Sequence, residues 1–548
     1  MKNSRFVLLL LLVLFSCGKP VPEDPGQAQS GTTDPDPAEP DPIEKSLLDF
    51  AAYKNGDNWG PALQQACKEC QRIHIPAGTY KMSAVRVASD TEITGEGEAT
   101  FIIPTSTILF RVEGLADGPV TIGADIPDFS NSLTLSREAG FQKGDMLILQ
   151  SQRNCMFRED CGDWTLGQTE SKGRTCFFGE IREVAAADGT RITLTESLQF
   201  PFYKANASEE TVKDGFEARS ATTAMRVVPA EHVTIRNLSV KNIPKCLEII
   251  RFKYARHCSA SDIAAYSEQR YEDGALLQLF KTNLAADCHF YRCHSRFSGA
   301  AAAQVKDLGR VYANYSIFNT FRLISSDRCS FEECSDNAAS HAFSVTYGNG
   351  SIPSVHCKVS GCRSENSVWA GVVSQQCTPW TELSGNTVTG SSQGIFAGSR
   401  FSVIRGNTVT TTLPYDTDHY YAHLSRGGTT GIAVFEGYAR GCEIKDNTVI
   451  GFRTGIAVMD GYEKNNIFDG PADLTVSGNR VRDCFNGFKV VRNSYNKTAV
   501  DLAATLTGNA FHAAVEAAAT GIGIDRSGAG GITLSDNSLT GFATEIKP

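Results

Sequence analysis

The carboxyl-terminal part of the chain repeats one short pattern, and a repeat of this kind leaves few folds open. The copies read TELSGNTVTG (381–390), SVIRGNTVT (402–410), CEIKDNTVIG (442–451), LTVSGNRVRD (474–483) and ITLSDNSLTG (532–541). Each copy alternates apolar and polar residues on both sides of an Asn, and alternation with period two is typical of a β-strand. Recurrence at roughly 20 to 45 residues indicates a solenoid. We therefore predict an all-β fold in which each repeat is one coil of a parallel β-helix.

The Asn residues of the repeats share one register, so stacked coils would place them above one another. They are Asn386, Asn407, Asn447, Asn479 and Asn537. An Asn side chain suits a tight turn and can hydrogen-bond to the next coil. The register continues upstream with Cys in place of Asn at Cys362, Cys334 and Cys293. We expect the main coils to extend from about residue 221 to about residue 545.

The amino terminus has the composition of an export signal. Residues 1–17 begin with Lys2 and Arg5, continue with an apolar run too short to span a membrane, and end at Cys17. The end of this segment is similar to a bacterial lipobox, whose Cys is lipidated. Residues 18–45 are rich in Pro, Asp and Gly and predict a flexible tether. We expect residues 46–548 to form a monomeric β-helix domain of an exported lipoprotein, on either face of the outer membrane of a Gram-negative bacterium.

Charge and cysteine content narrow the function classes. The formal net charge of −9 argues against nucleic acid as the main partner. The 17 Cys residues would suggest disulfides in an exported protein. Most of them fall at repeat registers, however, and this favours buried thiols over disulfides or a zinc site. Cys155, Cys161 and Cys176 lie outside the repeats and are the candidates for bridging.

The segment 47–103 predicts a cap on the solenoid. A helix over about residues 58–71, begun by Asp57 or Asn58, would present Ala62, Leu63 and Ala66 on one face and cover the open core. The segment contains Asp49-Phe50, Gly56-Asp57, Ile75-Pro76-Ala77-Gly78-Thr79-Tyr80 and Gly95-Glu96-Gly97. These pieces resemble the amino-terminal signature of the pectate-lyase-like superfamily, including pectate lyase 3 and tailspike-type proteins. The resemblance implies a right-handed parallel β-helix, but no particular chemistry, because that superfamily contains lyases, hydrolases, epimerases and binding proteins.

Residues 133–203, approximately, lose the coil register and predict a small antiparallel β insertion with a turn at Asp188-Gly189. This segment resembles an insertion of polysaccharide-active β-helix proteins. It would either wall one end of a substrate site or form a loop that contacts no ligand.

The segment GIAVFEG (431–437) indicates which residues face outward, because its Ile and Val would point into the coil and the Ala between them would point out. Applied to the other coils, it predicts one outward row and one row at the strand ends. The outward row is Glu248, Gln278, Gln304, Arg322, Ser344, Val373, Ala397, Ala433, Ala457 and Lys489. The strand-end row is Arg251, Lys281, Asp307, Ser325, Tyr347, Gln376, Glu436, Asp460 and Arg492.

The middle coils of these rows suggest a site for an acidic polysaccharide such as a pectin or a glycosaminoglycan. The cations are Arg251, Lys281, Lys306 and Arg322. β-Elimination from a uronate needs a neutralised carboxylate, a base near the C5 proton and an acid at the glycosidic oxygen. We expect Lys306 or His341 to be the base, Tyr347 the acid, and Lys281 and Arg322 the carboxylate partners.

Further polar and aromatic residues would bind the substrate. They are Gln278, Gln304, Asp307, Trp369, Gln376, Glu436 and His419. Asp307 with Glu248 could hold Ca²⁺, which prefers oxygen ligands. Two alternatives to a polysaccharide lyase stay open. One is a glycoside hydrolase that uses the carboxylate pair Glu436 and Asp460, and the other is a non-catalytic glycan-binding lipoprotein.

Overall fold

A computed structural model describes most of the chain. The described residues are 44–156, 166, 175–206, 221–242, 246–272, 276–304, 319–417, 428–435, 440–459, 473–491, 500–515, 520–526 and 529–547. The chain divides into a unit Met1–Pro42 and a unit Ile43–Pro548. All described residues belong to the second unit, so the predicted signal peptide with Cys17 lies outside them.

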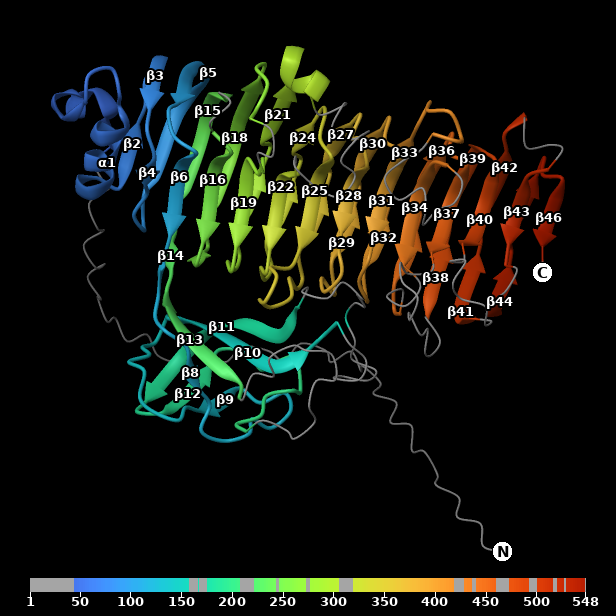
Figure 1. Ribbon diagram of the computed structural model, residues 1–548, viewed down its shortest axis with the longest axis horizontal. Helices are drawn as coiled ribbons and strands as arrows, with labels where there is room; N and C mark the ends of the chain where they lie inside the picture. Colours follow the sequence, from blue (N-terminus) through green and yellow to red (C-terminus); the bar gives the residue numbers. More distant parts are fainter. Residues whose placement is uncertain are drawn as a thin grey trace, which may run out of the picture. The chain divides into compact units, whose positions relative to one another are not determined.

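Parallel strands of successive coils stack side by side and build two large sheets (Figure 1). The first is a 13-stranded sheet, counted over the described residues. Its strands are β4 (Val85–Arg86), β6 (Ile108–Glu113), β16 (Glu248–Lys253), β19 (Phe280–Asn283), β22 (Asn319–Ile324), β25 (His341–Thr346), β28 (Ala370–Ser374), β31 (Gln393–Ala397), β34 (Thr430–Phe435), β37 (Thr454–Met459), β40 (Asn486–Val491), β43 (Ile522–Asp525) and β46 (Thr544–Lys547).

The second sheet contains 24 of the described strands, and from β20 onward most coils add one strand before and one after a bend. The strands are β1 (Glu44–Ser46), β2 (Arg72–His74), β3 (Gly78–Met82), β5 (Glu92–Pro104), β15 (Thr234–Asn242), β18 (Ser259–Ser267), β20 (His289–Tyr291), β21 (His294–Phe297), β23 (Ser330–Glu332), β24 (Ser335–Asp336), β26 (Lys358–Ser360), β27 (Arg363–Glu365), β29 (Glu382–Ser384), β30 (Thr387–Thr389), β32 (Val403–Arg405), β33 (Thr408–Thr410), β35 (Glu443–Lys445), β36 (Thr448–Ile450), β38 (Leu474–Ser477), β39 (Arg480–Cys484), β41 (Val500–Thr507), β42 (Ala510–Ala513), β44 (Ala529–Ser535) and β45 (Ser538–Thr540). The short pair β14 (Ala230–Glu231) and β17 (Ala255–Arg256) adds a further parallel contact between coils. The predicted parallel β-helix is confirmed.

The predicted Asn ladder occupies the bend of the 24-stranded sheet. The side-chain amide of Asn386 donates to the Oδ1 atom of Asn407 over 3.0 Å, and Asn407 donates in turn to Asn447 over 2.9 Å. The chain of bonds continues through Asn479, Asn509 and Asn537. Asn509 belongs to the ladder although the repeat pattern did not predict it. The left-handed backbone of the turn belongs to the residue before the Asn, such as Asp446 with φ 55°, and not to the Asn as predicted.

Aromatic rings and thiols stack inside the coils. The rings of Phe280, Phe321 and Phe343 follow one another with centroid separations of 4.7 and 4.8 Å. The Cys residues of the ladder register are buried, and their thiols donate to backbone carbonyl oxygens, as from Cys362 to Phe331. The prediction of buried thiols in the core is therefore confirmed for these positions.

A short helix covers the first coil. Helix α1 spans Gly60–Glu69 and buries Ala62, Leu63 and Ala66. The Oδ1 atom of Asn58 accepts hydrogen bonds from the backbone N–H groups of Gly60 and Ser83, which ties the start of the helix to the first coil. A 3₁₀ helix, η1 (Leu47–Tyr53), precedes α1. Among the described residues no helix is both long and apolar enough to cross a membrane.

An antiparallel sheet interrupts the coils between β6 and β15. Its strands are β7 (Leu115–Ala116), β8 (Val120–Thr121), β9 (Ser132–Thr134), β10 (Met146–Asn154), β11 (Phe177–Asp188), β12 (Arg191–Leu194) and β13 (Thr223–Val228). We call this sheet the insertion. It starts earlier and ends later than residues 133–203, because β7 and β13 continue directly from the coil strands and show no change of pattern in the sequence. β11 and β12 pair up to Asp188 and Arg191, with Gly189 at φ 57° in the turn.

Candidate functional site

Five cations occupy the same outward position in five consecutive strands of the 13-stranded sheet. Strand pairing aligns them in the order Arg86, Arg111, Arg251, Lys281 and Arg322. The next strands continue the row with Ser344, Val373, Phe396, Ala433, Ala457 and Lys489. Neighbouring strands are about 4.8 Å apart, so the five cations cover about 19 Å. We call them the cation row.

The cation row follows from a local pattern of alternation. In each of these strands the cation is flanked by residues that point into the core, such as Phe110 and Val112, or Phe321 and Leu323. Because side chains alternate across a strand, the residue between two buried neighbours faces outward. The two buried neighbours therefore fix the direction of each cation. They are both apolar in four of the five strands, and Lys281 lies between the buried Phe280 and the buried Thr282.

Two carboxylates lie beside the middle of the row. Glu248 accepts hydrogen bonds from Arg251 over 2.6 Å and from Lys281 over 3.4 Å. Arg251 also contacts Glu113 over 3.2 Å. The pKa of Lys281 is lowered by burial, an effect that Glu248 opposes and the neighbouring Arg251 and Arg322 reinforce. The five cations outnumber the two carboxylates, so the row retains net positive charge.

A buried polar cluster adjoins the Arg322 end of the row. His341 begins β25, and its ring meets the ring of Trp369 edge to face, with 3.9 Å between centroids. Burial and the positive charge of Arg322 lower the pKa of His341 well below its usual value, so the imidazole is neutral at pH 7. Burial lowers the pKa of Arg322 to about 10, and Tyr347 acts in the opposite direction. Three of the predicted catalytic residues are thus electrostatic neighbours.

Several polar atoms of this cluster are buried without a hydrogen-bond partner among the described residues. They are both ring nitrogens of His341, both side-chain polar atoms of Asn319, the Oγ of Ser344 and the Nε of Arg322. Asn319 and His341 pair with each other across β22 and β25, and Ser344 pairs with Arg322. Buried polar groups are normally hydrogen-bonded, and each exception calls for an explanation, of which a catalytic role is one. This group of atoms is therefore the best candidate for the reacting end of the site.

The structure corrects the predicted register of three coils. In β31, Phe396 holds the outward position predicted for Ala397, and Ala397 is part of the core. Glu248 and Gln278 were expected in the outward row, but Arg251 and Lys281, three residues later in each coil, hold that position. The segments LEIIRF and LLQLFK contain apolar residues of both parities. They therefore fit the outward-facing pattern in two registers, and only the pairing of Ile250 with Phe280 selects the correct one.

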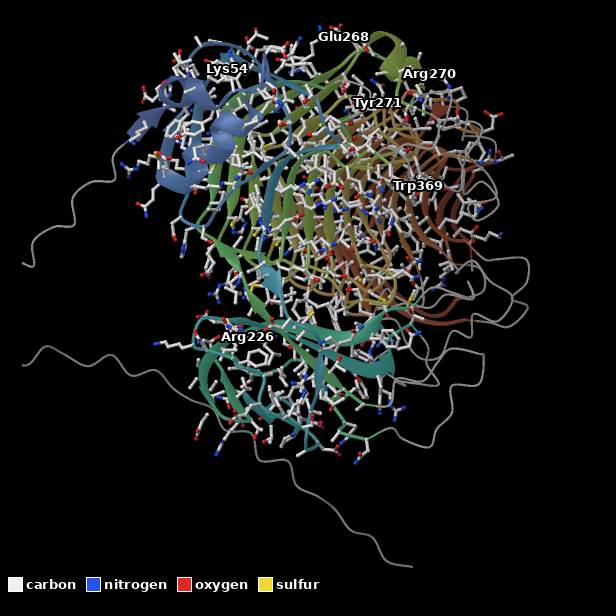
Figure 2. The ribbon with its side chains drawn as sticks, turned by 60° about the vertical axis from the view of Figure 1, so that its left-hand side comes forward. Lys54, Arg226, Glu268, Arg270, Tyr271 and Trp369 are labelled. Atoms are coloured by element: carbon white, nitrogen blue, oxygen red, sulfur yellow. The ribbon has the colours of Figure 1, made fainter. Side chains whose placement is uncertain are left out.

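Gln304 is also misplaced by the prediction. It belongs to a helical turn at residues 299–304 rather than to a strand of the 13-stranded sheet. Its side-chain amide closes two hydrogen bonds, accepting from the backbone N–H of Tyr271 over 2.7 Å and donating to the Tyr271 carbonyl over 2.9 Å. Tyr271 is labelled in Figure 2 together with Trp369. Gln304 holds a loop in place, and its amide is not directed toward the cation row.

Other predicted residues are only partly placed. Gln278 is buried two residues before β19, Trp369 is buried directly before β28, and Gln376 is half-buried two residues after β28. The residues that lie outside the described parts of the chain are Lys306, Asp307, His419, Glu436, Asp460 and Arg492. Their roles stay predictions, as does the calcium site, of which only Glu248 is described.

Arg86 and Arg111 are functional candidates that were not predicted from the sequence, because both precede the Asn repeats from which the outward row was derived. The signal was nevertheless present as Val85-Arg86-Val87 and Phe110-Arg111-Val112, which repeat the triplet of Phe321-Arg322-Leu323.

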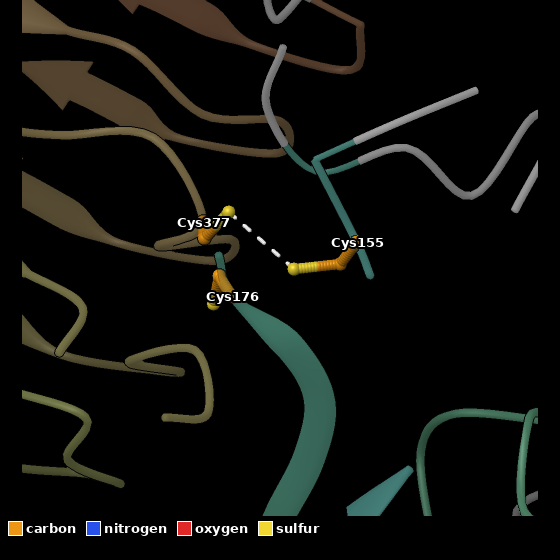
Figure 3. A group of neighbouring side chains, drawn as sticks. All are labelled: Cys155, Cys176 and Cys377. Atoms are coloured by element: carbon orange, nitrogen blue, oxygen red, sulfur yellow. Dashed lines mark hydrogen bonds between the residues drawn. The ribbon is translucent and has the colours of Figure 1, made fainter. Parts of the chain in front are cut away.

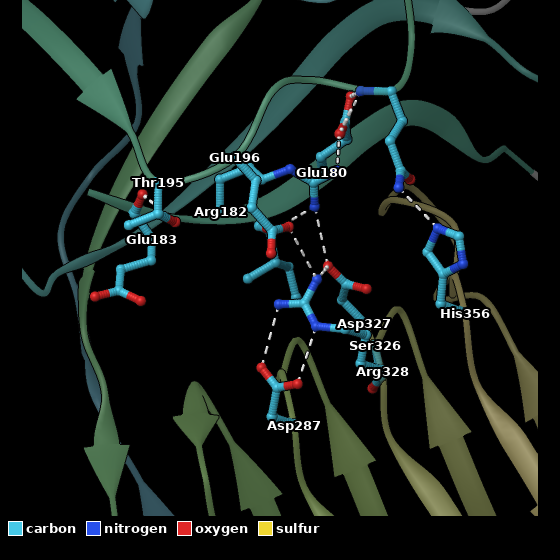
Figure 4. Close-up of polar contacts among 12 residues, drawn as sticks. Glu180, Arg182, Glu183, Thr195, Glu196, Asp287, Ser326, Asp327, Arg328 and His356 are labelled. Atoms are coloured by element: carbon cyan, nitrogen blue, oxygen red, sulfur yellow. Dashed lines mark hydrogen bonds and ion pairs between the residues drawn. The ribbon is translucent and has the colours of Figure 1, made fainter. Parts of the chain in front are cut away.

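A buried ionic network holds the insertion against the coils (Figure 4). Arg182 of β11 contacts Glu180 on its own strand and Asp327 of the solenoid, the latter over 3.0 Å. Burial raises the pKa of Asp327 to about 6. Asp327 also contacts Arg328, which pairs with Asp287 over 2.9 Å.

Comparisons with known proteins agree on the fold. No sequence profile of a protein family matches the chain, and no curated protein matches it. Among solved structures, the tailspike protein gp49 from Pseudomonas phage LKA1 is similar with a TM-score of 0.61 and 14% identity, over 88% of this chain and 74% of that one. The Gp54 tailspike of Acinetobacter baumannii bacteriophage AP22, solved with a capsular saccharide, has a TM-score of 0.54 and 12% identity, over 91% and 73%. The chain thus has the right-handed parallel β-helix fold of tailspike-type proteins.

Proposed function

We propose that this protein binds an anionic, uronic-acid-containing polysaccharide along the cation row and cleaves it by β-elimination. The observation that carries the proposal is the row of five cations ending at a buried cluster of His341, Arg322 and Tyr347. The Gp54 tailspike of similar fold was solved in complex with a capsular saccharide, which supports a saccharide ligand for this protein.

The residues of the cluster match the steps of an elimination. Arg322 and Lys281 neutralise the uronate carboxylate, which makes the C5 proton acidic. Neutral His341 has a lone pair to accept that proton, the electrons form the C4–C5 double bond, and the bond from C4 to the glycosidic oxygen breaks. Tyr347 supplies a proton to the leaving oxygen. Lys306, which the sequence also suggests as a base, is the alternative for the first proton transfer.

The test is a panel of pectins, alginates and glycosaminoglycans, with the ultraviolet absorbance of the unsaturated product and new reducing ends measured in parallel. We expect both signals to rise together on one class of substrate. Reducing ends without absorbance would refute elimination and point to hydrolysis, for which Glu436 and Asp460 were the predicted carboxylates. If neither absorbance nor reducing ends increase but binding is measurable, the protein is a non-catalytic glycan-binding protein.

Matched variants locate the reaction on the sheet. Arg322→Met and His341→Ala should each lower kcat/KM by roughly 100- to 1,000-fold, the usual cost of removing an electrostatic or proton-transfer group. Lys489→Met is the control, because Lys489 occupies the same outward row six strands away from Arg322. Equal losses in all three variants would contradict a site at the Arg322 end.

A calcium requirement is a separate proposal. Glu248 is engaged by Arg251 and Lys281, so a cation bound there would have to displace at least one of them. Chelator treatment before the assay tests it: full activity after chelation would exclude a required metal ion.

The protein is proposed to be a lipoprotein of the outer membrane, anchored through a lipid on Cys17. Cys17→Ser should release the protein from the membrane fraction, and mass spectrometry of the amino-terminal peptide of the natural sequence should show the lipid. A size-exclusion measurement of the soluble domain tests the expected monomer.

A further inference from the structure

Three cysteines from distant parts of the chain meet where the insertion contacts the solenoid (Figure 3). Cys155 follows the end of β10, Cys176 precedes β11, and Cys377 lies after β28. Their sulfur atoms all lie within 4.8 Å of one another, and the Sγ atoms of Cys155 and Cys377 are 3.4 Å apart. None of the three side chains is exposed to solvent.

The thiols of the coils also lie near one another along the stack, as Cys293, Cys334 and Cys362 do. Each of these three, however, donates a hydrogen bond to a backbone carbonyl oxygen. Cys155 instead donates to the sulfur of Cys377. A thiol is a weak donor and a weak acceptor, so gathering three sulfur atoms yields little hydrogen-bond energy. The cluster therefore needs another explanation than the one that accounts for the solenoid thiols.

The spacing suits a metal ion. Zinc binds thiolates at about 2.3 Å in tetrahedral geometry, which places neighbouring sulfur atoms about 3.8 Å apart. The separation of Cys155 and Cys377 is 3.4 Å and all three sulfur atoms lie within 4.8 Å of one another, so binding would need shifts of about 1 Å or less. A disulfide needs about 2.05 Å between sulfur atoms, and the 15 described cysteines are thiols.

We propose that Cys155, Cys176 and Cys377 form a structural binding site for a thiophilic d¹⁰ metal ion of the Zn²⁺ or Cu⁺ type. Such an ion joins two segments of the insertion to the turn after β28. Each thiol gives up its proton on binding, because thiolate is the ligand form. Metal affinity therefore falls as the pH is lowered.

The experiment uses the full chain purified under reductant, stripped with a chelator, and then given Zn²⁺ or Cu⁺ alone. Elemental analysis after desalting should show one tightly held ion per chain. Cys155→Ala and Cys377→Ala should weaken binding by roughly 100-fold or more, since even indirect supports of a metal ligand are worth 10- to 100-fold. Cys484→Ala is the matched control, because Cys484 is equally buried but donates to a carbonyl. Circular dichroism checks that each variant is folded.

A second measurement does not depend on the variants. Cd²⁺ added to the stripped natural protein should produce thiolate-to-metal charge-transfer absorption at one equivalent, and X-ray absorption of the zinc form should report three sulfur ligands. The proposal is overturned if no equivalent of either ion is retained, if the Cys484→Ala control loses the ion as the site variants do, or if mass spectrometry finds a disulfide between two of the three cysteines.

Discussion

Replacing Asn447 by Ala should destabilise the coils at the middle of the Asn ladder, and the size of the effect follows from the hydrogen bonds of Asn447. The Oδ1 atom of Asn447 accepts from the backbone N–H and from the side-chain amide of Asn407, each over 2.9 Å. Its own amide donates to the Ile404 carbonyl and to Asn479, also over 2.9 Å. Asn447 is fully buried. Four hydrogen bonds are therefore lost together.

The costs of these four bonds differ. The Asn407 N–H is left buried without an acceptor, which costs about 1 to 3 kcal/mol. The amide of Asn407 retains its bond to the Leu383 carbonyl, and Asn479 still accepts from the backbone of residue 447. The three remaining losses therefore cost about 0.5 to 1.5 kcal/mol each. We expect the free energy of opening this part of the solenoid to fall by about 2.5 to 7.5 kcal/mol.

Amide hydrogen exchange followed by mass spectrometry measures this change locally, which suits a repeat protein whose coils can open separately. A loss of 3 kcal/mol corresponds to roughly 100-fold faster exchange of the amides in β33 and β36. Asn131→Ala, at an exposed position of the insertion, is the control and should leave these rates unchanged. If Asn447→Ala folds and changes them by less than tenfold, the ladder does not stabilise the coils in the way argued above.

Three further results are expected. Burial raises the pKa of Asp336 to about 6 from a usual value near 3.8. Between these pH values the folded state binds more protons than the unfolded state, so the free energy of unfolding falls as the pH rises from 4 to 6. In Asp336→Asn this fall, measured by chemical denaturation, should be smaller by about 3 kcal/mol. Arg182→Met leaves the buried Glu180 without a cation and Asp327 with Arg328 as its remaining cation; it should cost about 3 to 5 kcal/mol at pH 7, and less at pH 5, where Asp327 is protonated; an equal loss at both pH values would contradict the ionic role. Arg111→Met should raise KM for the polysaccharide and reduce its salt dependence without changing kcat; an altered kcat would place Arg111 at the reacting atoms instead.

The fold could be predicted because its determinants are local and repeated. An Asn at a fixed place between two alternating segments appears in one coil after another, and each copy adds to the same conclusion. Asn509 could not be predicted in the same way, because the copy of the pattern around it, which contains Leu506 and Phe511, is less regular. The hydrogen bonds from Asn479 to Asn509 and from Asn509 to Asn537 show that the ladder is continuous there.

The candidate site was predicted in part, and the register errors at Glu248 and Gln278 have one physical source. Arg322 could be recognised because a cation between apolar neighbours stands out. The register of the coil around Glu248 could not be fixed, because Leu247, Ile249 and Ile250 are all apolar and only contact with the next coil decides which of them point inward.

Contacts across long sequence separations could not be predicted at all. Arg182 and Asp327 are 145 residues apart, and nothing near either residue indicates the other. Cys155 and Cys176 were recognised as standing outside the repeats, but their neighbour Cys377 was not connected with them, because the turn after β28 carries no periodic signal. Such contacts depend on how the insertion packs on the coils, which is a property of the whole fold.

The insertion also determines where the candidate acid lies. Tyr347 comes directly after β25, whose first residue is His341, and it packs in the same hydrophobic cluster as Phe178 of the insertion. The backbone that follows it is held by the insertion, since Gly350 donates to the Thr175 carbonyl over 2.7 Å and Phe177 donates to that of Ser351 over 2.9 Å. The solenoid therefore fixes His341 while the insertion fixes Tyr347. Any loosening of the insertion should change the separation of these two residues, and with it the proposed reaction, before it disturbs the cation row.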